Sequence, residues 1–269
     1  MTATSSLLDD LLADLAAEGD RLRDTVAGLD DSADGGWHTP TPAAGWDVAA
    51  QVAHLAWTDE AATAAATDKA AWDALVRQAL GDPDGFVDAE AHRLAALPAA
   101  DLLARWDRGR TTLAKALHDY PSGQKMPWFG PPMAPASMAT ARFMETWAHA
   151  LDVYDALGAA RPEPTDRIRH VAHLGVRTRD FAFGTHGLEP PAGEFRVELV
   201  APSGALWTWG PEGADQRVSG PAYDFCLLVT RRVHRDDTDL VAAGADAERW
   251  LGLAQAFAGP PGEGRGRRG

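Results

Sequence analysis

The sequence predicts an α+β protein, in which an N-terminal four-helix bundle is followed by a smaller α+β domain. Apolar residues recur at helical spacing through most of the first 160 residues. The proline-rich run RPEPTD then marks a boundary, and short β-branched and aromatic runs follow it. We therefore expect the bundle over residues 1–160, the smaller domain over residues 161–260 and a disordered tail over residues 261–269.

The first half contains long segments in which leucine, valine and alanine repeat every three or four residues. The long predicted helices cover residues 5–29, 46–66, 99–120 and 137–157, and a shorter one covers residues 68–80. Gly158 is a natural end for the last of them, because glycine accepts the left-handed conformation that often closes a helix. Proline-rich sequence predicts an irregular connection over residues 121–137.

The second half mixes both kinds of periodicity. A helix is expected over residues 166–183, and two more are expected over residues 221–233 and 246–259. Between them, FRVELVAP, ALWTWG and QRVSG have the composition of short strands. Pro202-Ser203-Gly204 forms the predicted turn between the first two strands. This pattern indicates a small sheet covered by helices.

The composition excludes several classes of function. A net charge of −14 and a pI of about 5.0 disfavour binding to nucleic acid, whose phosphates are also negative. The N-terminus lacks a signal-peptide pattern and no stretch is apolar enough to span a membrane, so we expect a cytoplasmic protein. Cys226 is the single cysteine, which fits a reducing compartment, and its apolar surroundings predict a buried, unreactive thiol.

The segment METWAHALDVYD carries the residues best suited to chemistry. Glu145 and His149 are four residues apart, so a helix places both side chains on one face, with Cβ atoms about 6 Å apart. His54, in the second predicted helix, is the best candidate for a third ligand of a shared divalent metal ion. Such a set suits Zn²⁺ first, and also Fe²⁺, Ni²⁺ or Mn²⁺. Three protein ligands leave a coordination position open, which is typical of catalytic sites.

Other interpretations of these residues stay open. A glutamate and a histidine at this spacing are often a plain contact between neighbouring helical turns, and a single histidine in an alanine-rich helix is often structural. His170 and His173 are interpreted as structural, because no carboxylate lies at ligand spacing beside them. Asp152 could accept a hydrogen bond from the second ring nitrogen of His149. The sequence contains no HExxH, GxSxG or phosphate-binding loop.

At TPAAGWDVAAQVAHLAW and FMETWAHALDVYDALG the chain resembles the mycothiol-dependent maleylpyruvate isomerase family, within the DinB-like superfamily of metal-binding four-helix bundles. This resemblance covers residues 5–158 and implies that His54, Glu145 and His149 are metal ligands. RVELVAPSGALWTWGP and VSGPAYDFCLLVTRR resemble the smaller domain of an actinobacterial branch of these proteins. In the isomerase an arginine of that domain assists catalysis, and Arg231 or Arg232 is the candidate for its place.

The resemblance implies a metal-dependent isomerase or thiol transferase acting on a small carbonyl or carboxylate substrate. The expected partners are this substrate and a low-molecular-weight thiol, with mycothiol as co-substrate, and neither nucleic acid nor a membrane. Trp57, Trp128, Phe129 and Trp147 could line the substrate pocket. Two alternatives remain: a thiol-independent metal hydrolase, lyase or cyclase of specialised metabolism, and a non-catalytic metal-binding module.

Overall fold

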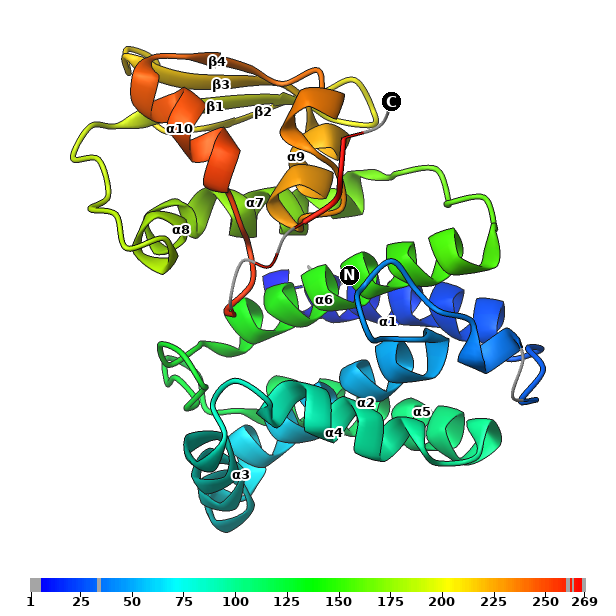
Figure 1. Ribbon diagram of the computed structural model, residues 1–269. Coiled ribbons are helices and arrows are strands. Elements are labelled where there is room, and N and C mark those ends of the chain that lie inside the picture. Colours follow the sequence, from blue (N-terminus) through cyan, green and yellow to red (C-terminus); the bar gives the residue numbers. More distant parts are fainter. Residues whose placement is uncertain (1–5, 33–34, 260–261, 263, 268–269) are drawn as a thin grey trace, which may run out of the picture. The chain divides into compact units, whose positions relative to one another are not determined.

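The computed structural model describes residues 6–32, 35–259, 262 and 264–267. The chain divides into two compact units, Met1–Arg161 and Pro162–Gly269 (Figure 1). Residues 261, 263, 268 and 269 of the predicted disordered tail lie outside the described residues. No helix in the described part of the chain is long and apolar enough to cross a membrane.

The first unit is helical, and its four long helices are those that the periodicity predicts. They are α1 (Leu7–Val26), α2 (Val48–Thr67), α5 (Ala99–Asp119) and α6 (Pro135–Leu157). Two shorter helices, α3 (Lys69–Gly81) and α4 (Phe86–Ala95), follow α2 along the chain, and a 3₁₀ turn (Gly36–His38) precedes it. Helix α4 is not predicted from the sequence. A helix of 10 residues is marginal alone, and α4 is stabilised by packing against α2.

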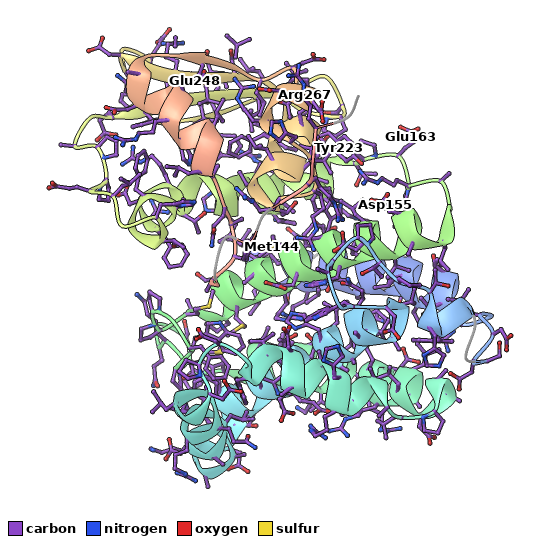
Figure 2. All side chains as sticks on the ribbon, in the orientation of Figure 1. Met144, Asp155, Glu163, Tyr223, Glu248 and Arg267 are labelled. Carbon is purple, nitrogen blue, oxygen red and sulfur yellow. The ribbon has the colours of Figure 1, made fainter. Side chains whose placement is uncertain are left out.

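Local sequence explains where these helices begin and end. Ser6 caps α1 through a reciprocal pair of hydrogen bonds with Asp9, and the carboxylate of Asp47 accepts the backbone N–H of Ala50 at the start of α2. Gly158 ends α6 with a φ of 61°, the left-handed conformation predicted for it. Figure 2 shows Asp155 near this end of α6. These helix ends are therefore set by short-range interactions along the chain.

Helix α2 is the central element of the first unit. Its residues from Val48 to Asp59 are all buried, because α4, α5 and α6 all pack against it. Inside this packing Arg142 of α6 forms an ion pair with Asp59 of α2, with Nε 2.9 Å from Oδ1 and both side chains almost fully buried. Helices α2 and α6, which carry the candidate site, are thereby joined directly.

The second unit is a four-stranded sheet with helices. Its elements are a 3₁₀ turn (Asp166–Ile168), α7 (Arg169–Arg177), α8 (Arg179–Thr185), β1 (Phe195–Val200), β2 (Leu206–Trp209), β3 (Gln216–Pro221), α9 (Ala222–Val229), a 3₁₀ turn (Arg235–Asp237), β4 (Val241–Ala243) and α10 (Ala245–Leu253). The strand order is β2-β1-β3-β4, with β1 parallel to β3 and the outer pairs antiparallel. The expected α+β class, with a helical N-terminal part, is confirmed.

Several details of the second unit differ from the prediction. The helices expected over residues 221–233 and 246–259 end earlier, at Val229 and Leu253. The helix expected over residues 166–183 is interrupted at Thr178, whose hydroxyl donates to the backbone carbonyl of Gln255, 2.8 Å away. Strand β4 is not predicted, because three residues are too few to show a period. Along β1, buried residues alternate with more exposed ones, as in a strand with one face toward the core. Trp250 of α10 packs edge-on against Phe195 of this strand.

Candidate metal centre

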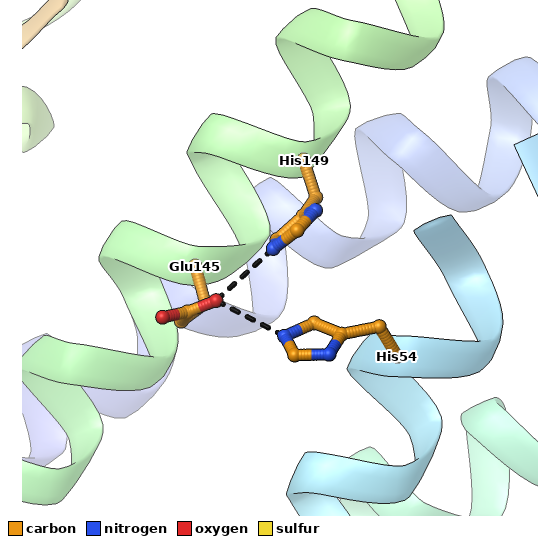
Figure 3. Close-up of side chains that lie close together, drawn as sticks. All are labelled: His54, Glu145 and His149. Atoms are coloured by element: carbon orange, nitrogen blue, oxygen red, sulfur yellow. Dashed lines mark hydrogen bonds and ion pairs between the residues drawn. The ribbon is translucent and has the colours of Figure 1, made fainter. Parts of the chain in front are cut away.

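The structure brings the three predicted ligands together between α2 and α6. Glu145 and His149 lie one turn apart on α6, and His54 faces them from α2 (Figure 3). One carboxylate oxygen of Glu145 lies 3.2 Å from Nε2 of His54 and 3.1 Å from Nε2 of His149. The two imidazole rings are 4.6 Å apart between centroids. Two nitrogens and one oxygen therefore converge on a single region.

This donor set fits one divalent ion. One ligand atom from each residue lies within 4.8 Å of the other two. A small shift of the side chains would bring all three atoms to coordination distance of one ion. His54 is buried, and Glu145 and His149 are partly exposed, so the cluster lies mostly inside the first unit. Imidazole nitrogen and carboxylate oxygen suit Zn²⁺ and the other divalent first-row metals.

The electrostatics of the cluster favour an ionised carboxylate. Burial of Glu145 opposes its ionisation, but the hydrogen bonds from His149 and His54 outweigh burial and hold its pKa well below its usual range. Glu145 is thus an acceptor-only group at neutral pH, ready to bind a cation. The cluster therefore combines one negative charge with two nitrogen donors.

Trp46 contacts both histidines of the cluster, and Gln51 contacts His149. The Trp46 indole is stacked on the His149 ring, at 5.8 Å between centroids and 17° between planes, and its Nε1 donates to Asp88 of α4. The side-chain oxygen of Gln51 lies within hydrogen-bond distance of Nδ1 of His149. Gln51 is not among the site residues predicted from the sequence. Its position three residues before His54 was the available signal.

The predicted acceptor for His149 was Asp152. Asp152 is buried on α6, one turn beyond His149. The nitrogen Nδ1 of His149 faces Gln51 of α2 instead, so a neighbouring helix supplies a partner that spacing along α6 does not indicate. A contribution of Asp152 to orienting the imidazole stays a prediction.

Comparison with known proteins supplies the family. Residues 15–154 match the family model described as the mycothiol maleylpyruvate isomerase N-terminal domain, which covers more than half of the chain. The chain belongs to this family. Residues 191–243 also match a model described as wyosine base formation. The first match contains all three residues of the cluster.

The chain is also similar to individual proteins and to solved structures. Two proteins of Mycobacterium tuberculosis strains, each named as uncharacterized, are 56% identical to the chain over 254 residues, covering 94% of this chain and 97% of theirs. A crystal structure of the mycothiol-dependent maleylpyruvate isomerase has a TM-score of 0.56 and 16% identity, and covers 89% of this chain and 95% of that one. The crystal structure of a histidine-to-alanine mutant of that isomerase has a TM-score of 0.57 and 15% identity. At this identity the structures show a shared fold.

An aromatic cluster lies next to the candidate metal centre of this family member. The Trp57 ring is 6.1 Å from that of His54, and it contacts Phe86 of α4 at 5.2 Å and Phe129 at 6.3 Å between centroids. Phe129 in turn contacts Trp72 and Trp128. A backbone bridge between Met126 and Met133 closes the loop that carries Trp128 and Phe129. The proline-rich connection thus presents aromatic rings beside α2.

Trp57, Trp128 and Phe129, three of the four predicted pocket residues, belong to this aromatic cluster. The fourth, Trp147, is buried on α6. Phe129 is 41% exposed, so one face of the cluster is accessible. Their role as a substrate wall stays a prediction.

The arginine candidates lie in the second unit, just after α9. Arg231 has a φ of 65°, and its Nη2 donates to the carbonyl of Gly262 at 3.3 Å. Burial lowers the pKa of Arg231, although the group stays protonated at neutral pH. Arg232 donates to the backbone carbonyl of Thr230. A role for Arg231 at the candidate metal centre stays a prediction.

His173 of α7 has a hydrogen-bond partner within the second unit. Nδ1 of His173 accepts a hydrogen bond from Nε1 of Trp209 at 3.2 Å. Burial, with a smaller effect of Arg177, lowers the pKa of His173 and favours the neutral ring that this acceptor role requires. Among the described residues, the one group with metal-ligand geometry is that of His54, Glu145 and His149.

Proposed function

We propose that this protein is a metal-dependent isomerase or thiol transferase that uses mycothiol as co-substrate and acts on a small carbonyl or carboxylate compound. One observation carries the proposal: in a member of the mycothiol maleylpyruvate isomerase family, His54, Glu145 and His149 converge on one point. An open set of three ligands supports a catalytic rather than a structural role.

The chain's own residues have distinct tasks in this proposal. His54, Glu145 and His149 would hold the ion, with Zn²⁺ the first candidate. When bound, a divalent ion supplies Lewis acidity and lowers the pKa of a thiol or water. Trp46 covers the His149 ring, and the aromatic cluster around Trp57 keeps water away from one side. A dry, cationic site stabilises a thiolate and a substrate carboxylate.

The proposed chemistry is reversible addition to an activated double bond. The thiolate sulfur forms a bond to one alkene carbon, and the π electrons move toward the conjugated carbonyl. Rotation about the resulting single bond and expulsion of the same thiolate then give the geometric isomer. If a proton is delivered to carbon instead, the product is a thioether and the reaction is a thiol transfer. A guanidinium such as Arg231 would hold the substrate carboxylate.

Metal analysis tests the ligand set. Purified protein is expected to bind about one equivalent of Zn²⁺, following the one-ion geometry of the site. The His54→Ala variant should lose most of it, whereas the control variant His118→Ala, at an exposed histidine of α5, should keep it. Full metal retention by His54→Ala would remove the proposed ligands.

Turnover tests the co-substrate. We expect isomerisation or thioether formation from maleylpyruvate or a related unsaturated keto acid only when mycothiol is added. Turnover of any substrate without a thiol would replace the proposal by the hydrolase, lyase or cyclase alternative. A metal sphere closed by a fourth protein ligand would indicate the non-catalytic alternative.

A further inference from the structure

The Trp46 indole lies against both imidazole rings of the candidate metal centre. Its centroid is 5.2 Å from that of the His54 ring, with the planes tilted by 52°. It is 5.8 Å from that of the His149 ring, with the planes nearly parallel at 17°. The two histidines belong to different helices, α2 and α6. A single side chain therefore touches both nitrogen donors of the cluster.

The turn of residues 41–46, which we call the Trp46 turn, carries this indole. The backbone N–H and the hydroxyl of Thr41 both donate to the carbonyl of Trp46 at 2.8 Å, and the N–H of Trp46 donates to the carbonyl of Ala43 at 3.0 Å. Gly45 has a φ of 79°, a left-handed conformation that glycine adopts without strain. The backbone that carries the indole is therefore closed by its own hydrogen bonds just before α2 begins.

Helix α4 makes two hydrogen bonds to the Trp46 turn. Asp88 and His92 are four residues apart, so one face of α4 carries both side chains. Oδ1 of Asp88 accepts the indole Nε1–H of Trp46 at 3.0 Å. Nε2 of His92 lies 3.1 Å from the carbonyl of Gly45, and the ring nitrogen is the donor because a carbonyl can only accept. Because α4 also packs against α2, it joins the indole to the helix that carries His54.

The His54 ring depends on packing for its orientation. Its Nδ1 is buried and has no hydrogen-bond partner among the residues that the structure describes. A histidine that binds a metal is usually oriented by a hydrogen bond at its second ring nitrogen. In the absence of that bond, the neighbours of the ring are the indoles of Trp46 and Trp57, with centroids 5.2 and 6.1 Å away. Aromatic packing therefore does here what a hydrogen bond usually does.

The position of the indole bears on the direction of both nitrogen donors. The Glu145 carboxylate lies 3.2 Å from Nε2 of His54 and 3.1 Å from Nε2 of His149 (Figure 3). Rotation of either imidazole would carry its Nε2 away from this shared space. A planar side chain packed against both rings opposes such rotation, because close-packed rings cannot turn past one another.

We propose that Trp46 is a positioning residue of the candidate metal centre, and that α4 holds its indole in place through Asp88 and His92. The use of the two imidazoles by a metal rests on the proposed function, whereas their packing against the indole does not. Helix α4 supplies no ligand in this proposal, but it contributes to the geometry of the ligands.

Proton NMR of the metal-free protein tests the packing and the role of α4. Nuclear Overhauser effects are expected between the indole protons of Trp46, assigned by their loss in Trp46→Leu, and the imidazole C–H protons of His54 and His149. Asp88→Ala leaves the indole in the chain but removes the acceptor of its N–H, so these effects should weaken. The control Asp84→Ala, at an exposed aspartate before α4, should leave them unchanged. Native effects in Asp88→Ala would overturn the role of α4.

Zn²⁺ affinity, measured by competition with a chelating dye, tests the consequence for metal binding. It is expected to fall about 10–100-fold in Trp46→Leu, as it does when other groups that orient ligands are removed. Trp46→Phe keeps an aromatic ring against the imidazoles and should recover most of the affinity. Asp88→Ala should weaken binding, but less than Trp46→Leu. The matched control is Trp209→Leu in the second unit, where the indole N–H donates to His173 at 3.2 Å, and its affinity should be native.

Cobalt substitution separates positioning from a merely structural role. Co²⁺ absorbs visible light in bands whose positions depend on the geometry of its ligands. All three proposed ligands remain in Trp46→Leu, so a shift of these bands would report their changed orientation. We expect the bands to shift in Trp46→Leu and to stay native in Trp209→Leu. Native band positions in Trp46→Leu would overturn the positioning role, even if that variant were less stable.

The outcomes separate this proposal from the proposed function. Failure of the native protein to bind Zn²⁺ and Co²⁺ would remove the proposed function, and the NMR result would still decide whether α4 holds the indole against the two rings. Native Zn²⁺ affinity in a folded Trp46→Leu protein would contradict the positioning role alone. If Trp46→Leu does not fold, Asp88→Ala decides, because native Zn²⁺ affinity and native Co²⁺ bands in that variant would contradict the proposal.

Discussion

Arg231 occupies a backbone conformation that its side chain disfavours. Its N–H donates to the carbonyl of Leu228 and the next N–H, of Arg232, donates to Leu227, which closes α9 in the way that usually places glycine at this position. Among the described residues Arg231 is the one non-glycine residue with positive φ. Left-handed backbone costs a side-chain-bearing residue about 1–2 kcal/mol. Retaining a strained residue is typical of functional positions.

Replacing Arg231 by glycine and by alanine separates strain from function. Both variants lose the guanidinium, but only glycine relieves the backbone. Arg231→Gly should therefore unfold in urea with a free energy about 1 kcal/mol higher than Arg231→Ala. Both variants should lose most of kcat/KM for a carboxylate substrate. Native turnover in Arg231→Gly would show that this arginine has no catalytic role.

At the scale of elements, the buried ion pair between Arg142 and Asp59 joins α6 to α2. Arg142 precedes the candidate ligand Glu145 by three residues and Asp59 follows the candidate ligand His54 by five, so the pair joins the same two helices that carry the candidate ligands. Two charges in a nonpolar interior contribute little net stability, but they penalise every packing in which they separate. The pair therefore favours the packing of α2 on α6 in which the candidate ligands meet.

Removing one partner of this pair should destabilise the first unit strongly. We expect Asp59→Ala to lower the free energy of unfolding by about 3–5 kcal/mol, because Arg142 is left buried and uncompensated. The matched control is Asp73→Ala, which breaks an exposed pair with Lys69 on α3 and should cost less than about 1 kcal/mol. Denaturant unfolding measures both. Equal effects of the two variants would contradict a role for the buried pair.

At the scale of the whole molecule, the candidate ligands and the candidate arginine belong to different units. His54, Glu145 and His149 all lie in Met1–Arg161, and the packing that supports them comes from helices of the same unit. Arg231 lies in Pro162–Gly269. We therefore expect metal binding to need only the first unit, whereas turnover needs both units.

A fragment of residues 1–161 tests this division. It should unfold cooperatively and bind Zn²⁺ with the affinity of the full chain, because it contains the bundle core and every proposed ligand. It should not turn over substrate, because the proposed carboxylate-binding arginine is missing. Calorimetry and dye competition measure the first two properties. A fragment that is folded yet binds Zn²⁺ far more weakly would show that the second unit supports the metal centre.

The sequence by itself determined the class of fold, the long helices and the candidate ligands. Helical periodicity is a local property, and so are the caps at Ser6, Asp47 and Gly158. The spacing of Glu145 and His149 follows from helix geometry alone. His54 is the predicted third ligand because a third ligand has to come from another helix. The motif around it also resembles the family to which the chain belongs.

Only the tertiary structure decided the features that depend on contacts between distant segments. Helix α4 forms because α2 offers it a surface, and the helix after Asp166 breaks where Thr178 bonds to Gln255. The pairing of His149 with Gln51 joins residues 98 positions apart. No periodicity records such a pairing, because a hydrogen bond between helices depends on how their faces are turned in space and not on spacing along either one.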